Sequence, residues 1–559
     1  MLLGYTKPKE LMKQYSKLNY KSCAISDYNS LSGSVNFFKA CKDSGINPII
    51  GTRIKITNPE NQSFGYISLY AKNKLGWFEL IKFTSNLYLT DELSCDIQSL
   101  RKYSNLACII SGNDFIDNDN SIKILKDIFK EDIFIGTDRR NNKNKLSILE
   151  GISENLNIKK LASPLVAYSK RQDKNNHLTM YSSHLGITQR EWVSCGDSNF
   201  SQFYHGDYSL PEKLEGYNID EVKNLELFES LFEQYSILER PTLPDFDCPN
   251  GLSQSEYLRQ LCREGYKKKL TNLTQEQKII YGDRVNRELE VINKANLEGY
   301  FLIVQDYINW AKNQGWLVGV GRGSSAGSLI AYLTNITGVD PIKYSLLFER
   351  FYNDGRNTAD KVSYPDIDTD FPVDKREEVI EYIRNKYGRD KVTQVVTFSS
   401  LQGRGALKEV LRVNQACPPK MMDEISKNLP MKDKISDLLE ESKESSIINW
   451  TLKYEPKRVS DYCELKEDGT FTGPYAAHFE QAIEIESTFK NFGKHASALV
   501  ISRGSMIESC PMIKEKNGSE LIAGIEYTEM EEMGKVKMDL LGLKILDKLS
   551  LARDILKGK

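Results

Sequence analysis

Histidine is scarce in this chain, and paired cysteines and long apolar runs are missing. Only five of the 559 residues are His, and none lies in the first 176 residues. The ten Cys form no Cys-x-x-Cys pair, which argues against a zinc motif or a disulfide framework and predicts reduced thiols. No stretch approaches the roughly 18 apolar residues of a membrane span, and no secretion signal is visible at the start. We therefore expect a cytoplasmic protein without a membrane partner.

An excess of charge of one sign is also missing. The chain has 75 Lys and Arg against 77 Asp and Glu, a net charge of −2. The average field is therefore near zero, and any contact with nucleic acid must come from local basic patches. With 40% hydrophobic and 27% charged residues, the composition excludes collagen-like and fully disordered chains. The length predicts about three or four domains.

The N-terminal third alternates short apolar runs with amphipathic segments. Residues 22–27 and 47–51 read as buried strands on either side of a helix at 31–44. Such alternation indicates an α/β layer or barrel. Three prolines between 241 and 249 favour an extended connector, so we place a domain boundary near 236. Residues 413–490 are polar and helical in pattern, and they read as an insertion.

A glycine-rich segment follows, Val318-Gly-Val-Gly-Arg-Gly-Ser-Ser-Ala-Gly-Ser-Leu-Ile330. Its glycines allow positive φ and close approach of the backbone to a ligand. The segment runs into a helix expected at 326–333, whose free N–H groups and dipole would favour a phosphate. It lacks the Gly-Lys-Ser/Thr ending of a Walker A loop. A tight turn that packs against a sheet is the alternative.

Three acids alternate along one predicted strand face: Asp366, Asp368 and Asp370. Because their carboxylates repel one another, the arrangement is costly unless cations neutralise it. Mg²⁺ prefers one or two carboxylates plus water and substrate phosphates, which suits this display. A calcium loop would take Glu377 as its last ligand, but Phe371 occupies the position where that loop needs Gly. A solvated turn is the third interpretation.

A lone acid, Asp539, lies in an apolar strand near the C-terminal end of the chain. By itself it reads equally as a buried, hydrogen-bonded side chain. If its strand pairs beside Asp366 and Asp368, the three acids can hold two Mg²⁺ ions about 4 Å apart. That arrangement serves phosphoryl transfer to a hydroxyl.

A basic stripe is predicted on the helix that begins near residue 403. Arg404, Lys408 and Arg412 occur at i, i+4 and i+8 and therefore share one helix face. Such a face contacts a nucleic-acid backbone, or it is simply solvated.

The order of these segments resembles the family C replicative DNA polymerases, the bacterial DNA polymerase III alpha subunits. The resemblance spans nearly the whole chain and is densest over 297–412 and 488–548. It is carried, in the family's order, by Tyr300-Phe-Leu-Ile-Val-Gln-Asp-Tyr-Ile, Gly319-Val-Gly-Arg-Gly-Ser-Ser-Ala-Gly-Ser328, Leu347-Phe-Glu-Arg-Phe351, Pro365-Asp-Ile-Asp-Thr-Asp-Phe371, Tyr387-Gly-Arg-Asp, Phe492-Gly-Lys-His-Ala496 and Lys537-Met-Asp-Leu-Leu-Gly-Leu543.

The resemblance implies an α/β and α+β multidomain fold and a template-directed DNA polymerase activity. The activity transfers a nucleotidyl group from a dNTP to the 3′-hydroxyl of primer-template DNA with two Mg²⁺ ions. The implied domains are a degenerate, (β/α) barrel-like polymerase-and-histidinol-phosphatase domain at 1–180, a connector packing on the palm at 181–235, a beta-type nucleotidyltransferase palm with a mixed sheet at 236–410 and 490–559, and an inserted helical thumb at 411–489.

The resemblance also implies roles for single residues. Asp370 lies in the acidic motif, but the family uses the first two acids of the run. The implied catalytic and metal-binding residues are Asp366, Asp368 and Asp539, and the implied nucleotide-binding residues are Gly323, Ser324, Arg350 and Lys537.

Two departures from the family pattern lead to further expectations. The family's N-terminal domain opens with a His-x-His pair, whereas this chain has Asp27-Tyr28 where relatives often have Asp-His and has no His before His177. We therefore expect no metal cluster in this domain. The chain also ends twenty residues after Asp539, where the family continues into a fingers domain. We expect a split enzyme, of plausible phage origin, whose second polypeptide carries the fingers and C-terminal domains and the contact with a sliding clamp.

Two other classes of function stay open at this stage. One is a non-catalytic polymerase-like scaffold that binds partners, and the other is a calcium- or nucleotide-binding regulator. Retention of three mutually repelling acids favours the enzyme.

Overall fold

The computed structural model describes residues 4–59, 63–90, 92–111, 119–138, 143–194, 207–353, 364–516 and 518–558. The chain forms two compact units. The first comprises Met1–Leu80, Thr90–Tyr235 and Thr397–Gly493, and the second comprises Ile81–Leu89, Ser236–Val396 and Lys494–Lys559. Both units mix helices with strands, as the expected α/β and α+β class requires.

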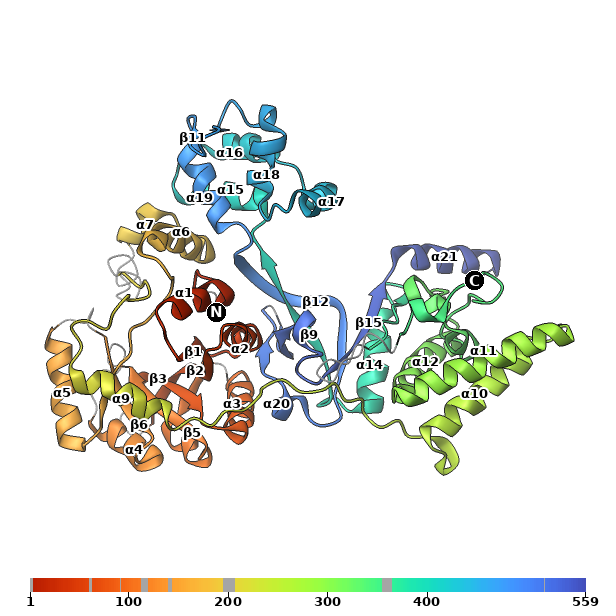
Figure 1. Ribbon diagram of the computed structural model, residues 1–559. Coiled ribbons are helices and arrows are strands. Elements are labelled where there is room, and N and C mark those ends of the chain that lie inside the picture. Colours follow the sequence, from red (N-terminus) through yellow and green to blue (C-terminus); the bar gives the residue numbers. More distant parts are fainter. Residues whose placement is uncertain are drawn as a thin grey trace. The chain divides into compact units, whose positions relative to one another are not determined.

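The first unit contains a seven-stranded mixed sheet with the order β1-β2-β3-β5-β6-β7, in which β4 pairs with β2 (Figure 1). β1 and β2 run parallel, β3 is antiparallel to both of its neighbours, and β5, β6 and β7 are parallel again. The strands are β1 (Ser22–Tyr28), β2 (Asn47–Asn58), β3 (Ser63–Ala71), β4 (Ser94–Asp96), β5 (Leu106–Ser111), β6 (Ile133–Thr137) and β7 (Lys160–Ala162). The strands predicted at 22–27 and 47–51 are confirmed as β1 and β2.

Helices connect and flank these strands. The helix expected at 31–44 is α2, and its buried Phe37, Phe38 and Cys41 lie at helical spacing, as an amphipathic helix requires. The helices are α1 (Pro8–Lys17), α2 (Ser34–Asp43), α3 (Lys74–Leu87), η1 (Ile97–Lys102), α4 (Asp119–Phe129), α5 (Lys143–Leu156), η2 (Arg171–Asp173), α6 (Lys174–Leu185), α7 (Gln189–Ser194) and α9 (Ile219–Glu229).

The polar stretch after residue 413 is helical, as its pattern predicts. Its helices surround an apolar cluster that includes Leu407, Leu411 and Phe479. The elements are α15 (Gly403–Val413), α16 (Pro419–Lys427), α17 (Lys432–Ser442), α18 (Ile447–Tyr454), η7 (Pro456–Arg458), the β10–β11 hairpin (Glu464–Leu465 and Phe471–Thr472) and α19 (Ala476–Ile485).

A six-stranded mixed sheet has the order β13-β14-β9-β12-β15-β8. β15 is antiparallel to β12 and parallel to the short edge strand β8, which places the last strand of the chain beside residues 369–371. The strands are β8 (Thr369–Phe371), β9 (Val392–Ser400), β12 (Phe489–Ile501), β13 (Met512–Lys514), β14 (Leu521–Glu526) and β15 (Val536–Gly542).

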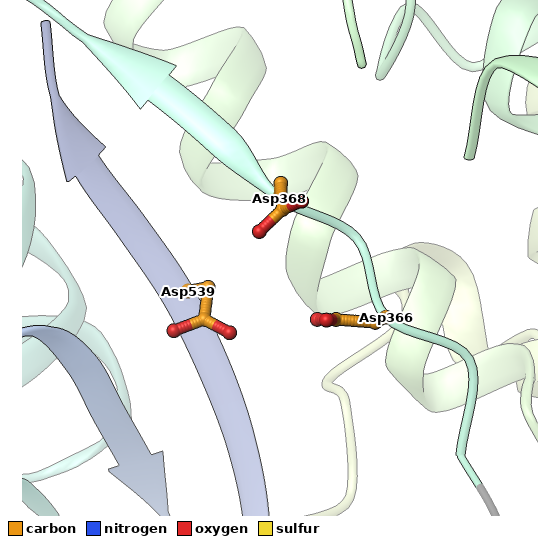
Figure 2. Close-up of side chains that lie close together, drawn as sticks. All are labelled: Asp366, Asp368 and Asp539. Carbon is orange, nitrogen blue, oxygen red and sulfur yellow. The ribbon is translucent and has the colours of Figure 1, made fainter. Parts of the chain in front are cut away.

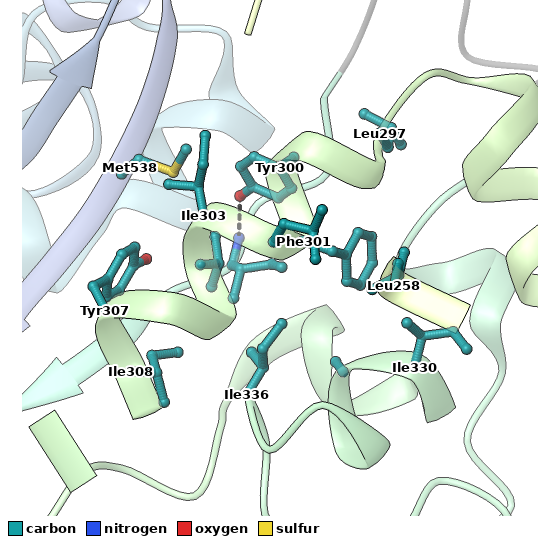
Figure 3. Packing of buried hydrophobic residues seen from close by; sticks show 14 of the residues in the cluster. Leu258, Leu297, Tyr300, Phe301, Ile303, Tyr307, Ile308, Ile330, Ile336 and Met538 are labelled. Carbon is teal, nitrogen blue, oxygen red and sulfur yellow. Dashed lines mark hydrogen bonds between the residues drawn. The ribbon is translucent and has the colours of Figure 1, made fainter. Parts of the chain in front are cut away.

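One buried helix, α12 (Glu298–Asn313), supports the second unit. It is apolar on nearly all sides, as expected for a helix enclosed in a core. Figure 3 shows it with Met538 of β15 on one side and Ile330 and Ile336 on another. The other helices are η3 (Pro249–Gly251), α10 (Gln254–Lys269), α11 (Gln275–Lys294), η4 (Gly323–Gly327), α13 (Leu329–Leu333), η5 (Phe348–Arg350), α14 (Arg376–Tyr387), α20 (Met506–Ser509), η8 (Tyr527–Glu529) and α21 (Lys544–Leu556).

In the described ranges, no helix combines the length and the apolar character that crossing a membrane requires. The nine cysteines in those ranges all carry free thiols.

Candidate active site

The pairing of β8 with β15 brings three acids together. Leu540 of β15 pairs with Thr369 of β8, so Asp539 lies beside the segment that carries Asp366 and Asp368. One carboxylate oxygen from each acid lies within 4.8 Å of the others. Figure 2 shows the three side chains facing a common space. The strand proper begins only at Thr369, so Asp366 lies on the loop that enters it.

The core behind the strands fixes this arrangement. Along β15 the side chains alternate, and Met538 and Leu540 enter the core on the face opposite Asp539. The Tyr300 hydroxyl of α12 accepts a hydrogen bond from the Ile367 backbone N–H at 3.1 Å, which holds the loop between the two acids (Figure 3).

The three negative charges perturb one another. Burial, then Asp539 and Asp368, raises the pKa of Asp366 to about 6, while the Lys537 ammonium opposes the rise. Burial also raises the pKa of Asp368, and Arg322 opposes that rise. Both acids therefore lie where deprotonation is disfavoured in the absence of a further cation.

Arg322 pairs with two acids of the acidic run, Asp368 and Asp370. Its guanidinium lies 3.2 Å from an Asp368 oxygen and 3.3 Å from an Asp370 oxygen. Asp370 is buried against this arginine and is not part of the three-acid group. Glu377, which would be the last ligand of a calcium loop, lies in the first turn of α14 and pairs with Arg376 instead.

Both oxygens of Asp539 accept hydrogen bonds from the protein. The Ser497 hydroxyl donates to Oδ1 at 3.4 Å, and the Tyr527 hydroxyl donates to Oδ2. His495 stacks on Tyr527 with ring centroids 4.8 Å apart, and its Nδ1 accepts the Ala498 N–H at 3.0 Å, which assigns the ring proton to Nε2. Partners of this kind orient a metal ligand and tune its affinity.

The glycine-rich loop lies against the acids. Gly319 donates to the Asp370 carbonyl at 2.9 Å, and a Cβ at Gly323 would come within 3.7 Å of an Asp368 oxygen. Gly323 has φ of +65°, a conformation in which glycine avoids the strain of a side chain. The glycine-rich loop therefore lies beside the acids, a proximity that the sequence did not predict.

The predicted phosphate cradle at the following helix is wrong. The helix begins at Leu329, and the Leu329 and Ile330 N–H groups donate to the Glu288 carboxylate at 3.0 and 3.1 Å. Glu288 is a built-in anion that occupies this N-terminus. Gly323 and Ser324 lie in the preceding turn η4, and their predicted role in nucleotide binding stays a prediction.

The other two predicted nucleotide-binding residues, Lys537 and Arg350, also lie in the second unit. Lys537 projects from β15, with its ammonium 4.1 Å from the centre of the Tyr527 ring and 3.8 Å from a Glu531 oxygen. Arg350 is exposed at the end of η5, the short turn that contacts η4. Both roles stay predictions.

The predicted basic stripe forms a helix face, but each member has protein partners. Arg404 donates to the Leu429 carbonyl at 2.6 Å, and Lys408 pairs with Asp423 at 2.5 Å. Arg412 pairs with Glu409 at 2.8 Å. It also donates to the carbonyl oxygens of Gly186 and Ile187, which directly follow α6. These contacts hold the three side chains within the first unit, and their role in DNA binding stays a prediction.

Several site residues escaped the sequence reasoning. Tyr527 and Ser497 belong to none of the motifs singled out in the sequence. Ser497 reaches Asp539 through the pairing of β12 with β15, and Tyr527 reaches it from η8. Arg322 had a visible signal, since it is the single cation inside the glycine-rich segment.

The donor set fits magnesium. Three carboxylates supply hard oxygen ligands, and they lie close enough together for a cation to relieve their mutual repulsion. Among the described residues, this is the one such group of His, Cys, Asp or Glu that the structure brings together. In the N-terminal domain, Asp27 lies on β1, and the Arg53 guanidinium lies 4.9 Å from the ring of the neighbouring Tyr28. The expected absence of a metal cluster there stays a prediction.

Comparison with known proteins agrees with these features. A family model described as "Bacterial DNA polymerase III alpha NTPase domain" matches residues 256–542, and a PHP domain model matches residues 1–126. The chain belongs to the bacterial DNA polymerase III alpha family.

Three similar relatives are named DNA polymerase III subunit alpha. Those of Aquifex aeolicus and Borreliella burgdorferi are each 31% identical over 100% of this chain, which covers 51% and 49% of their lengths. That of Pseudomonas aeruginosa is 28% identical over 99% of this chain and 47% of its own length. The chain thus spans about half the length of these relatives. A solved metal-dependent phosphoesterase from Bifidobacterium adolescentis is 10% identical with a TM-score of 0.22, which is too low to support an argument.

Proposed function

We propose that this chain is the catalytic part of a template-directed DNA polymerase that adds a nucleotide from a dNTP to a primer 3′-hydroxyl. The observation that carries the proposal is the convergence of Asp366, Asp368 and Asp539 within 4.8 Å, beside a glycine-rich turn, in a member of this family. A decoy that only bound partners would gain nothing from three mutually repelling acids.

The protein's own residues have separable tasks in this proposal. Asp366, Asp368 and Asp539 would hold two Mg²⁺ ions, which when bound stabilise charge on the reacting phosphate and favour deprotonation of the attacking hydroxyl. The η4 turn at Gly323 and Ser324 would orient the triphosphate. Arg350 and Lys537 would place positive charge beside it before reaction, so that little reorganisation accompanies the transfer.

The finer proposal is that a second polypeptide supplies the fingers and, through its C-terminal domains, the contact with a sliding clamp. Support comes from α21, which presents apolar side chains to solvent and could dock in a groove of such a partner. The exposed fractions are 56% for Ile545, 50% for Leu549, 63% for Leu551, 66% for Ile555 and 87% for Leu556. The cytoplasmic location and the phage origin stay predictions.

The test is extension of a primed template with Mg²⁺ and all four dNTPs, with and without the fingers-bearing polypeptide. We expect the Asp539→Ala variant to lose about 10³-fold or more in incorporation, because charge stabilisation at the reacting group is a large contribution. Asp374→Asn, an exposed acid beyond β8, is the matched control and should behave as wild type. Near-normal extension by Asp539→Ala would contradict the active-site assignment, and robust extension by the isolated chain would contradict the split enzyme.

A further inference from the structure

A buried carboxylate lies directly behind the glycine-rich loop. The Glu288 side chain on α11 is fully buried, and it accepts hydrogen bonds from the Ser328 hydroxyl at 2.9 Å and from the backbone of Leu329 and Ile330. These contacts fix the first turn of α13, which follows η4 immediately. The orientation of the turn that carries Gly323 and Ser324 thus depends on a residue of another helix.

One turn earlier on α11, Arg284 connects two loops. Its Nε pairs with Glu288 at 2.6 Å, and its Nη2 donates to the Gly327 carbonyl at 2.8 Å and to the Leu346 carbonyl at 3.2 Å. Gly327 ends η4, and Leu346 lies just before η5, the turn that carries Arg350. A planar guanidinium can reach both carbonyls and the carboxylate together, whereas a lysine ammonium is a single point of charge.

The two loops also touch directly. A Cβ at Gly327 would come 2.7 Å from the Leu347 carbonyl oxygen, so the backbones of η4 and η5 meet where only glycine fits. The far end of α13 is held as well, because Lys269 and Lys312 donate to the Tyr332 and Asn335 carbonyls. Burial lowers the pKa of both lysines to about 8.

We propose that the Arg284–Glu288 pair is a positioning element that sets the spacing between the η4 turn and Arg350, and thereby the affinity for the incoming nucleotide. The inference rests on the proposed polymerase function, since it assigns a nucleotide to these two loops. A buried ion pair is often dispensable for stability, because a well-packed neutral pair can replace it. The carbonyl bridge from Arg284 has no such replacement.

The test compares four variants by steady-state incorporation of one nucleotide in the active assembly. Arg284→Met and Glu288→Gln each leave one partner of a buried pair alone and should lower the thermal midpoint. The double variant, Arg284→Met with Glu288→Gln, removes both charges. Its thermal midpoint should therefore return most of the way to that of wild type. In Arg284→Met, Arg284→Lys and the double variant, we expect KM for dNTP to rise about tenfold to a hundredfold, as misplacement of binding groups does.

Three further readouts separate positioning from folding. The dissociation constant for primer-template DNA and kcat should stay within about threefold of wild type, since nothing at the acids changes. The control pair is Lys386 and Asp306, which lie 2.5 Å apart between α14 and α12. Its neutral double variant, Lys386→Met with Asp306→Asn, should leave KM for dNTP unchanged.

If the double variant recovered both the midpoint and the wild-type KM, the pair would be merely structural and the inference overturned. The same holds if the control pair raised KM equally. Failure of the polymerase proposal is distinguishable, because Asp539→Asn would then leave incorporation intact whatever the Arg284 variants do.

Discussion

The charge of Asp366 makes the metal-free protein less stable at neutral pH, and removing that charge should stabilise it. Burial and the neighbouring acids raise the pKa of Asp366 from an ordinary 3.8 to about 6 in the folded chain. A folded-state pKa above the unfolded one means that the folded state binds more protons between these values. Stability therefore falls as pH rises from about 4 to about 6, and stays low above that.

The magnitude follows from the same rise. A pKa difference of one is worth about 1.4 kcal/mol, so the full rise would correspond to about 3 kcal/mol. Because the Asp366 side chain is exposed, solvent screening reduces the expected effect to about 1 kcal/mol. For a domain of 150–250 residues this shifts the thermal midpoint by about 2–4 °C.

The assay is thermal unfolding of wild type and Asp366→Asn with a chelator at pH 8 and pH 4.5, with Asp374→Asn as control. We expect Asp366→Asn to melt higher than wild type at pH 8 and nearly equally at pH 4.5. Added Mg²⁺ should raise the midpoint of wild type more than that of the variant, because ligand binding stabilises the state that binds it. A variant no more stable than wild type at pH 8, or equally shifted at both pH values, would refute the electrostatic reasoning.

Three further predictions concern other parts of the chain. Tyr527→Phe removes the hydrogen bond to Asp539 and should weaken Mn²⁺ binding, measured by electron paramagnetic resonance, about 10- to 100-fold; unchanged affinity would contradict the role of Tyr527. Arg412→Ala should lower the thermal midpoint of the first unit, because it removes contacts to Glu409 and to the Ile187 carbonyl. The slope of the logarithm of the DNA-binding constant against the logarithm of salt concentration should stay unchanged. A reduction of that slope by about 0.9 would instead indicate a lost phosphate contact. Leu549→Glu should abolish co-purification with the fingers-bearing polypeptide while leaving the circular dichroism spectrum unchanged, and retained association would exclude α21 as the docking helix.

The local patterns of the sequence singled out the three acids but not their local structure. A run of alternating acids and a lone acid in an apolar strand indicated Asp366, Asp368 and Asp539, and the pairing of β15 with β8 brings them together. The predicted common strand face was wrong, because β8 begins only at Thr369 and Asp370 pairs with Arg322 instead of joining the group.

Long-range partners could not be predicted in this way. The helix after the glycine-rich loop looked like a phosphate cradle, but Glu288, far earlier in the chain, already caps it. The spacing of Arg404, Lys408 and Arg412 is the same whether the helix face meets DNA, solvent or Asp423 and Glu409. Helical periodicity identifies a face but not what covers it.

The most direct test of the central claim is to locate the divalent metal itself. Fe²⁺ bound in place of Mg²⁺ and treated with ascorbate and peroxide cuts the backbone near its ligands. The account predicts cuts close to Asp366–Asp368 and to Asp539 that excess Mg²⁺ suppresses and Asp539→Asn abolishes, and no such cuts before His177. Cuts elsewhere, or cuts at these acids that neither Mg²⁺ nor the Asp539 substitution affects, would contradict it.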